Sequence, residues 1–88
     1  MTPELRGQLR LSLLRQADAA SSRGLSLEVF VVGAKIIGIP CTPAEVEKEI
    51  EYLLDKRMLE KLRPPVSPEL WRACIRAEGR DWLAQEGY

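Results

Sequence analysis

Apolar residues in the first part of the chain recur every three or four positions. These positions are Leu5, Leu9, Leu13, Ala17 and Ala20, with Leu14 beside them. The spacing predicts an amphipathic helix with one face turned to a core. Thr2-Pro3-Glu4 supplies a hydroxyl cap, a proline for the first helical position and an acid in the first turn, and the helix should end before Gly24. Three arginines lie off the apolar face and are expected to be solvated, namely Arg6, Arg10 and Arg15.

The next apolar stretch is ambiguous between helix and strand. β-Branched residues favour a strand at Val29–Val32. Gly33 interrupts that run, however, and Gly38 stands where a glycine commonly follows the end of a helix. We therefore predict a helix from Leu27 to about Ile37, capped by Ser26, with a strand of one or two residues before it at Gly24-Leu25-Ser26.

Only two charges, Glu28 and Lys35, occur between Leu25 and Cys41. Apolar side chains must consequently project from more than one face of this helix, at Val29, Val32 and Ile36. Two interpretations stay open at this point. The surface is either a contact site for another protein chain, or it is covered by the first and last helices.

The third predicted helix has the strongest local signal in the sequence. Thr42-Pro43-Ala44-Glu45 has the residues of a reciprocal capping box with proline in the first turn. The inward stripe that follows consists of Val46, Ile50, Leu53 and Leu54. Between Thr42 and Asp55 there are five acidic residues and one basic residue, so this helix should present an acidic outer surface.

The sequence after Asp55 predicts a β-hairpin and a short final helix. The ranges Met58–Arg63 and Trp71–Arg76 have the composition of strands, the second with alternating polarity. Three prolines between Pro64 and Pro68 cannot donate ladder hydrogen bonds, so that segment should be a loop, with one helical turn starting at Ser67. Ala77 to about Gln85 should form the last helix. The predicted core comprises Leu9, Leu13, Val31, Ala34, Val46, Ile50, Leu53, Trp71, Ile75 and Leu83.

This order of elements resembles a winged helix-turn-helix. Residues 42–62, TPAEVEKEIEYLLDKRMLEKL, are similar to the recognition helix and first wing strand of bacterial ArsR- and MarR-type regulators. Residues 75–83, IRAEGRDWL, are similar to their Leu-Thr-x-x-Gly-x-x-x-Leu motif. Small winged-helix proteins of phages and prophages share the same style. The resemblance implies an α+β, mostly helical fold: one domain over residues 1–88, with a three-helix core, a two- or three-stranded wing and a short C-terminal helix. It also implies DNA binding in transcription regulation.

The chain departs from the regulators in three places. Their recognition helix carries residues that can bond to bases and phosphates, whereas the outward positions here include Glu45, Glu47 and Glu51, which phosphates would repel. Arg76 replaces the threonine that normally caps the last helix. The turn at 38–41 contains a proline and is longer than in many such motifs.

The charge distribution is compatible with two different functions. Thirteen basic and thirteen acidic residues give zero net charge, so the molecule has no global attraction to DNA. Basic residues gather near the predicted wing, which favours phosphate contacts with weak sequence reading. The candidate double-stranded DNA contacts are Lys48, Lys61, Arg63, Arg72 and Arg76. The alternative is a protein-interaction module, or self-association, through the apolar second helix or the acidic third helix. Its candidate residues are Val29, Val32, Ile36, Glu47 and Glu51.

Catalysis is the least expected function. The chain has no histidine and only two cysteines, Cys41 and Cys74, so we expect neither a metal site nor a cofactor. Arg72 and Arg76 flank Cys74 at alternate positions and would lower its pKa, although lone cysteines are more often structural. Unpaired thiols, and the absence of a leader or an apolar span, predict a cytoplasmic protein with no membrane contact.

Overall fold

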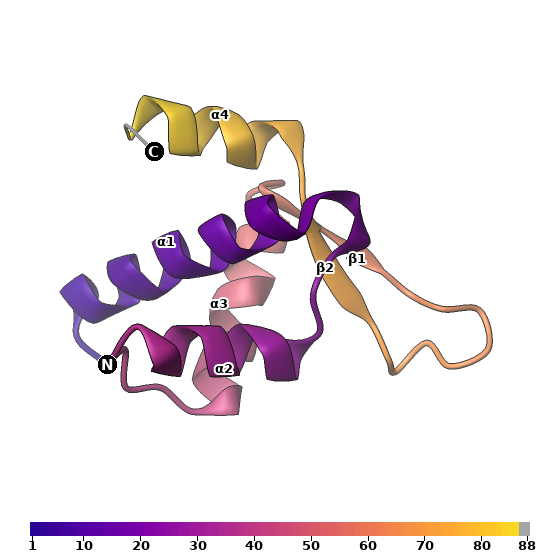
Figure 1. The fold of residues 1–88 in the computed structure, drawn as a ribbon, viewed down its shortest axis with the longest axis horizontal. Helices are drawn as coiled ribbons and strands as arrows, with labels where there is room; N and C mark the ends of the chain where they lie inside the picture. Colours follow the sequence, from indigo (N-terminus) through magenta and orange to yellow (C-terminus); the bar gives the residue numbers. More distant parts are fainter. Residues whose placement is uncertain (87–88) are drawn as a thin grey trace.

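The computed structural model of the chain describes residues 1–86, and its fold is α+β and mostly helical. Helices precede and follow a two-stranded antiparallel sheet (Figure 1). The elements are α1 (Pro3–Ala20), a 3-10 turn η1 (Ser21–Arg23), α2 (Leu27–Ile36), α3 (Pro43–Asp55), β1 (Leu59–Leu62), β2 (Arg72–Ile75) and α4 (Ala77–Gln85). Every helix and strand predicted from the sequence is present, including α2, where strand propensity gave way to helix.

Local hydrogen bonds start the first three helices where the sequence places caps. The Thr2 hydroxyl accepts the Leu5 N–H at 3.1 Å, and the Ser26 hydroxyl accepts the Val29 N–H at 3.4 Å. At α3 the bonds are reciprocal: the Glu45 N–H donates to the Thr42 hydroxyl at 3.2 Å and the Thr42 N–H donates to the Glu45 carboxylate at 2.9 Å. These bonds satisfy amides that a helix leaves without backbone partners.

Two helices end in the same hydrogen-bonded motif with different residues at its left-handed position. After α2, Gly38 has a φ of 88° and Ile39 donates to the Ala34 carbonyl. After α3, Arg57 has a φ of 61° and Met58 donates to the Leu53 carbonyl. A side chain at this φ carries a steric cost that glycine avoids. The α3 motif is therefore complete but strained at Arg57.

The sheet is short, and prolines limit it at the loop end only. β1 and β2 pair antiparallel in the register Leu59↔Ile75, Glu60↔Cys74, Lys61↔Ala73 and Leu62↔Arg72. Each strand is one residue shorter at both ends than the sequence predicted, and the loop between them closes a hydrogen bond from Leu70 N–H to the Ser67 carbonyl without a helical turn. Leu25 adds a one-residue bridge on the other side of β2, exchanging two 2.9 Å hydrogen bonds with Ala73.

The core lies between α1, α2, α3 and the inner face of the hairpin. Nine of the ten predicted core residues are buried. Trp71 is the exception: it is only half-buried, because it lies just before β2 at the loop end of the hairpin. Buried residues outside the prediction include Leu14, Ala17, Phe30, Ile39, Leu59 and Ala73. Phe30 is the largest fully buried side chain, on the α2 face opposite Val32.

Gly79 lets α4 pack directly on the chain that leaves α3. A Cβ at this position would lie 2.5 Å from the Met58 carbonyl oxygen and 2.9 Å from Ile75 Cγ1. The same carbonyl accepts the Arg76 N–H at 2.9 Å. The glycine of the IRAEGRDWL segment is thus required by close backbone approach.

Candidate functional site

A partly buried ion-pair cluster joins α1 to α3. Glu49 is 5% exposed, and its carboxylate accepts a 2.6 Å hydrogen bond from Arg10 Nε, with Arg6 Nε at 3.8 Å. The Arg10 guanidinium also lies 3.7 Å from the centre of the Tyr52 ring. The expectation that Arg10 is solvated was therefore wrong, since its charge is needed beside a buried carboxylate. This cluster links α3 to α1. Glu49 therefore does not contribute to the outer face of α3, which is formed by other residues.

Acidic side chains dominate that outer face, as predicted. Glu47 and Glu51 are exposed, and Lys48 is exposed between them. Glu47 and Lys48 have no ion-pair partner among residues 1–86, whereas Glu51 accepts a 3.1 Å hydrogen bond from Lys61 Nζ. The carboxylates of Glu47 and Glu51 would therefore repel an anion that approached this face of α3.

Lys61 is held by its neighbours. Besides the bond to Glu51, its ammonium lies 4.5 Å from the centre of the Trp71 ring, and its side chain is only 18% exposed. An opposite charge and an aromatic face both stabilise the ammonium where it is. Lys61 therefore ties β1 to α3 and is not a freely available phosphate contact.

Arg63 and Arg72 are the available cations of the hairpin. Arg72 begins β2 opposite Leu62, and Arg63 follows β1 directly, so both stand where the strands enter the loop. Both are exposed, and within residues 1–86 no carboxylate pairs with either. Figure 1 shows that this loop extends away from the helices. Two unneutralised guanidinium groups are consequently presented at the base of a projecting loop.

Arg76 is placed differently. It stands at the N-cap position of α4, and its side chain makes no capping hydrogen bond, as expected from the loss of the usual threonine. Its Nε lies 3.6 Å from Glu78 Oε1, beyond hydrogen-bond distance, and is buried without a hydrogen-bond partner among the described residues. Arg76 is partly neutralised and points its charge toward α4, so it is a weaker phosphate candidate than Arg72.

A second candidate surface runs along α2. Val29, Val32, Ile36 and the following Ile37 are 47%, 55%, 78% and 63% exposed. The interpretation that the first and last helices cover this face was wrong, because α4 packs beside α1 on the side away from α2 (Figure 1). We call Val29, Val32 and Ile36 the α2 stripe. A contiguous exposed apolar row is a candidate interaction site.

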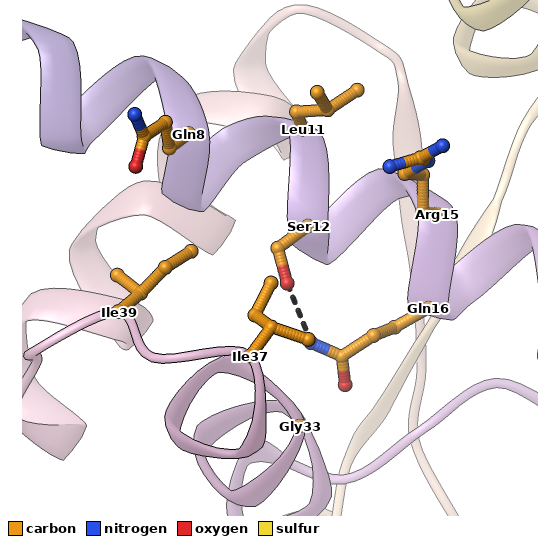
Figure 2. A pocket seen from close by; sticks show the side chains of 8 residues that line it. All are labelled: Gln8, Leu11, Ser12, Arg15, Gln16, Gly33, Ile37 and Ile39. Atoms are coloured by element: carbon orange, nitrogen blue, oxygen red, sulfur yellow. Dashed lines mark hydrogen bonds between the residues drawn. The ribbon is translucent and has the colours of Figure 1, made fainter.

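A groove of about 330 Å³ lies beside the stripe, between α1 and α2. Its lining residues are Gln8, Leu11, Ser12, Arg15, Gln16, Gly33, Ile37 and Ile39 (Figure 2). The Gln16 amide donates to the Ser12 hydroxyl at 3.1 Å and lies 3.3 Å from the Phe30 carbonyl. A Cβ on Gly33 would overlap the Gln16 carboxamide, so the glycine allows Gln16 to bridge the helices at the groove floor.

The two thiols have no activated environment. Burial raises the pKa of the Cys74 thiol above its ordinary value, and the Glu60 carboxylate, its partner across the sheet, raises it further. Arg76 lowers this pKa by less, so the net shift is upward and the flanking arginines do not activate the thiol, in line with the structural role favoured for a lone cysteine. Burial also raises the pKa of Cys41, with Lys35 opposing the effect. Among residues 1–86, no three carboxylate or thiol groups are clustered closely enough to hold a metal ion.

Comparison with known proteins assigns no family. No protein-family model matches the chain, and no curated protein matches its sequence. None of the helices in residues 1–86 is long and apolar enough to cross a membrane. The hairpin arginines and the α2 surface are accordingly the two features of the chain that bear on its function.

Sequence reasoning missed Glu49, although a signal for it existed. Glu49 follows Val46 by three residues and precedes Leu53 by four, which places it on the inward stripe of α3. An acid on a buried stripe requires a cationic partner, and Arg10 provides it from 39 residues away. The partner itself had no signature in the sequence.

Proposed function

We propose that the chain is a winged-helix protein that binds double-stranded DNA mainly through its hairpin loop, with weak sequence preference. The order of α1, α2, α3 and the hairpin supports this, as does the Leu25 bridge, which adds a one-residue third strand beside β2. The observation that carries the proposal is the pair of exposed, unpaired arginines, Arg63 and Arg72, at the base of the projecting loop.

These arginines act by electrostatic attraction to phosphates. Each guanidinium can donate two parallel hydrogen bonds to a phosphate, and neutralising a phosphate releases condensed counterions from the duplex. Such contacts set position and carry little sequence information. Because the outer face of α3 is acidic, Lys48 is its only candidate contact, and base reading by this helix is disfavoured.

The Glu51–Lys61 pair limits the affinity in this proposal. While Lys61 is bonded to Glu51, its charge is compensated and its contribution to phosphate binding is small. Removing the Glu51 charge would leave Lys61 as a third cation beside Arg63. Glu51 therefore opposes phosphate binding in two ways in this proposal. Its carboxylate repels phosphates, as predicted from the sequence, and it also neutralises the charge of Lys61.

A salt titration tests the phosphate contacts. Fluorescence anisotropy with mixed-sequence duplex DNA should give log K falling linearly with log salt, with a slope of about −0.9 per phosphate contact. The double change Arg63→Ala and Arg72→Ala should flatten the slope by nearly two. The matched control, Lys35→Ala with Arg80→Ala, removes the same charge from α2 and α4 and should leave the slope nearly unchanged. Equal flattening by both double variants would show that only net charge matters and would refute a hairpin site.

The acidic helix supplies a second test. Glu51→Gln should strengthen binding and steepen the salt slope by about 0.9, because it releases Lys61 as a phosphate contact. Glu47→Gln should strengthen binding with a smaller change in slope, because it removes repulsion without freeing a cation. Sequence-specific binding that these changes destroy would mean that the glutamates read bases directly, as acceptors from cytosine.

A second candidate function is a protein-interaction module, which the exposure of the α2 stripe favours. It predicts no detectable DNA binding even at low salt. Anisotropy of the parent protein at low salt therefore separates the two functions before any substitution is made.

A further inference from the structure

The α2 stripe is an apolar ridge directly opposite the buried face of its helix. Val29, Val32 and Ile36 follow one another at spacings of three and four residues, so their side chains form one continuous row. Phe30 and Ala34 occupy the opposite face and are fully buried. The ridge has the pattern of a helix packed on both sides, although within residues 1–86 only one side is covered.

The two charges of α2 lie on one edge of this ridge. Glu28 and Lys35 are seven residues apart, which is close to two helical turns, so they lie on the same side and roughly 10 Å apart along the axis. Both are exposed, and neither has an ion-pair partner among the described residues. The groove beside Gly33 and Ile37 borders the other edge. The helix therefore has an acid near its start, a base near its end and an apolar row between them.

This arrangement is complementary to itself under a two-fold rotation. We propose that two copies of the chain associate by packing α2 against α2 in antiparallel orientation, with the two-fold axis passing close to Val32. The rotation keeps the charged edges on the same side and reverses their direction, so Glu28 of each copy faces Lys35 of the other. A parallel two-fold pairing would instead place the charged edge of each copy against the uncharged groove edge of the other, so neither charge would gain a partner. Antiparallel packing also aligns the two helix dipoles favourably.

The area of the apolar surface on α2 determines how strong the association of two copies should be. An apolar patch of a few hundred Å² is smaller than the roughly 800 Å² that each partner buries in a standard stable interface. The grooves beside Ile37 extend the contact along the edge opposite the charges, but the dimer should still be reversible, with a dissociation constant in the micromolar range or weaker. The inference does not require DNA binding, because it involves none of the hairpin residues.

Sedimentation of the full chain at concentrations from about 10 µM to about 1 mM tests the association. The parent should shift from monomer to dimer across this range. Val32→Asp should weaken dimerisation at least about thirty-fold, because it places two carboxylates beside the axis. The matched control is Val66→Asp, which makes the same change at a loop residue that is 94% exposed and should dimerise like the parent. A monomer at all concentrations, or equal weakening by both variants, would overturn the proposal.

Charge reversal tests the orientation. Glu28→Lys alone and Lys35→Glu alone should each weaken the dimer about five-fold or more, because two attractive pairs become repulsive. The double reversal should restore the parental affinity. Failure of the double reversal to restore it would refute antiparallel pairing even if a dimer forms. Thermal unfolding of each variant verifies that these exposed substitutions leave the fold intact. Fluorescence anisotropy of the same variants with duplex DNA measures DNA binding separately, because Arg63 and Arg72 are unchanged in them.

Discussion

Alanine substitution of two helical glycines should change stability in opposite directions. Gly7 lies in α1 with nothing within 4 Å of the position its Cβ would take, whereas the Cβ of an alanine at position 79 would lie 2.5 Å from the Met58 carbonyl oxygen. Alanine is favoured over glycine in helices by about 1 kcal/mol because it restricts the unfolded backbone. At Gly7 nothing opposes this gain. At Gly79 the gain competes with a clash against main chain, which cannot rotate away.

The Met58 carbonyl has little freedom to move. It accepts the Arg76 N–H at 2.9 Å, and the Met58 N–H closes the end of α3 by donating to Leu53. Relieving the clash would require a shift of several tenths of an ångström in α4 or in this segment. Overpacking costs typically about 1–3 kcal/mol, so Gly79→Ala should lose about 1–3 kcal/mol net, while Gly7→Ala should gain up to about 1 kcal/mol.

Urea and thermal unfolding, followed by circular dichroism, measure both effects. For a chain of this size, 1 kcal/mol corresponds to a shift in melting temperature of roughly 4–8 °C. Gly7→Ala should melt higher than the parent and Gly79→Ala lower. A Gly79→Ala protein that melts at or above the parent would refute the close approach of α4 to Met58, and with it the physical reason given for this glycine.

Ile50→Ala should cost about 2–5 kcal/mol in urea unfolding, because Ile50 is fully buried and truncation leaves a cavity; a parental stability would mean that α3 faces the other way. Arg57→Gly should stabilise the chain by roughly 1 kcal/mol, since its φ of 61° favours glycine, and a loss would show that the Arg57 side chain contributes more than its strain costs. Cys74 should react with iodoacetamide more slowly than Cys41 below pH 9. Burial raises the pKa of both thiols above the ordinary value, which disfavours the reactive thiolate at both positions, and Cys74 is the more buried. Faster alkylation of Cys74 would contradict that placement.

Most predictions that depended on residues within about four positions of each other were confirmed, the helical turn at Ser67 excepted. Thr2, Ser26 and Thr42 cap their helices, and Gly38 ends α2 at a positive φ, because these hydrogen bonds are short-range and residue-specific. The period of apolar residues likewise determined which face of α3 turns inward. The strand ends were less accurate, because pairing between β1 and β2 fixes them and the loop prolines only limit them.

The tertiary structure alone decided which charges are available and which apolar face is left bare. The sequence contains a cluster of basic residues near the hairpin, but it does not show that Glu51 and Trp71 hold Lys61 while Arg63 and Arg72 stay unpaired. It also shows apolar residues on several sides of α2, but their exposure depends on α4 packing beside α1 instead of α2. Local preference is encoded in neighbouring residues, whereas ion pairing and coverage depend on which distant segments meet.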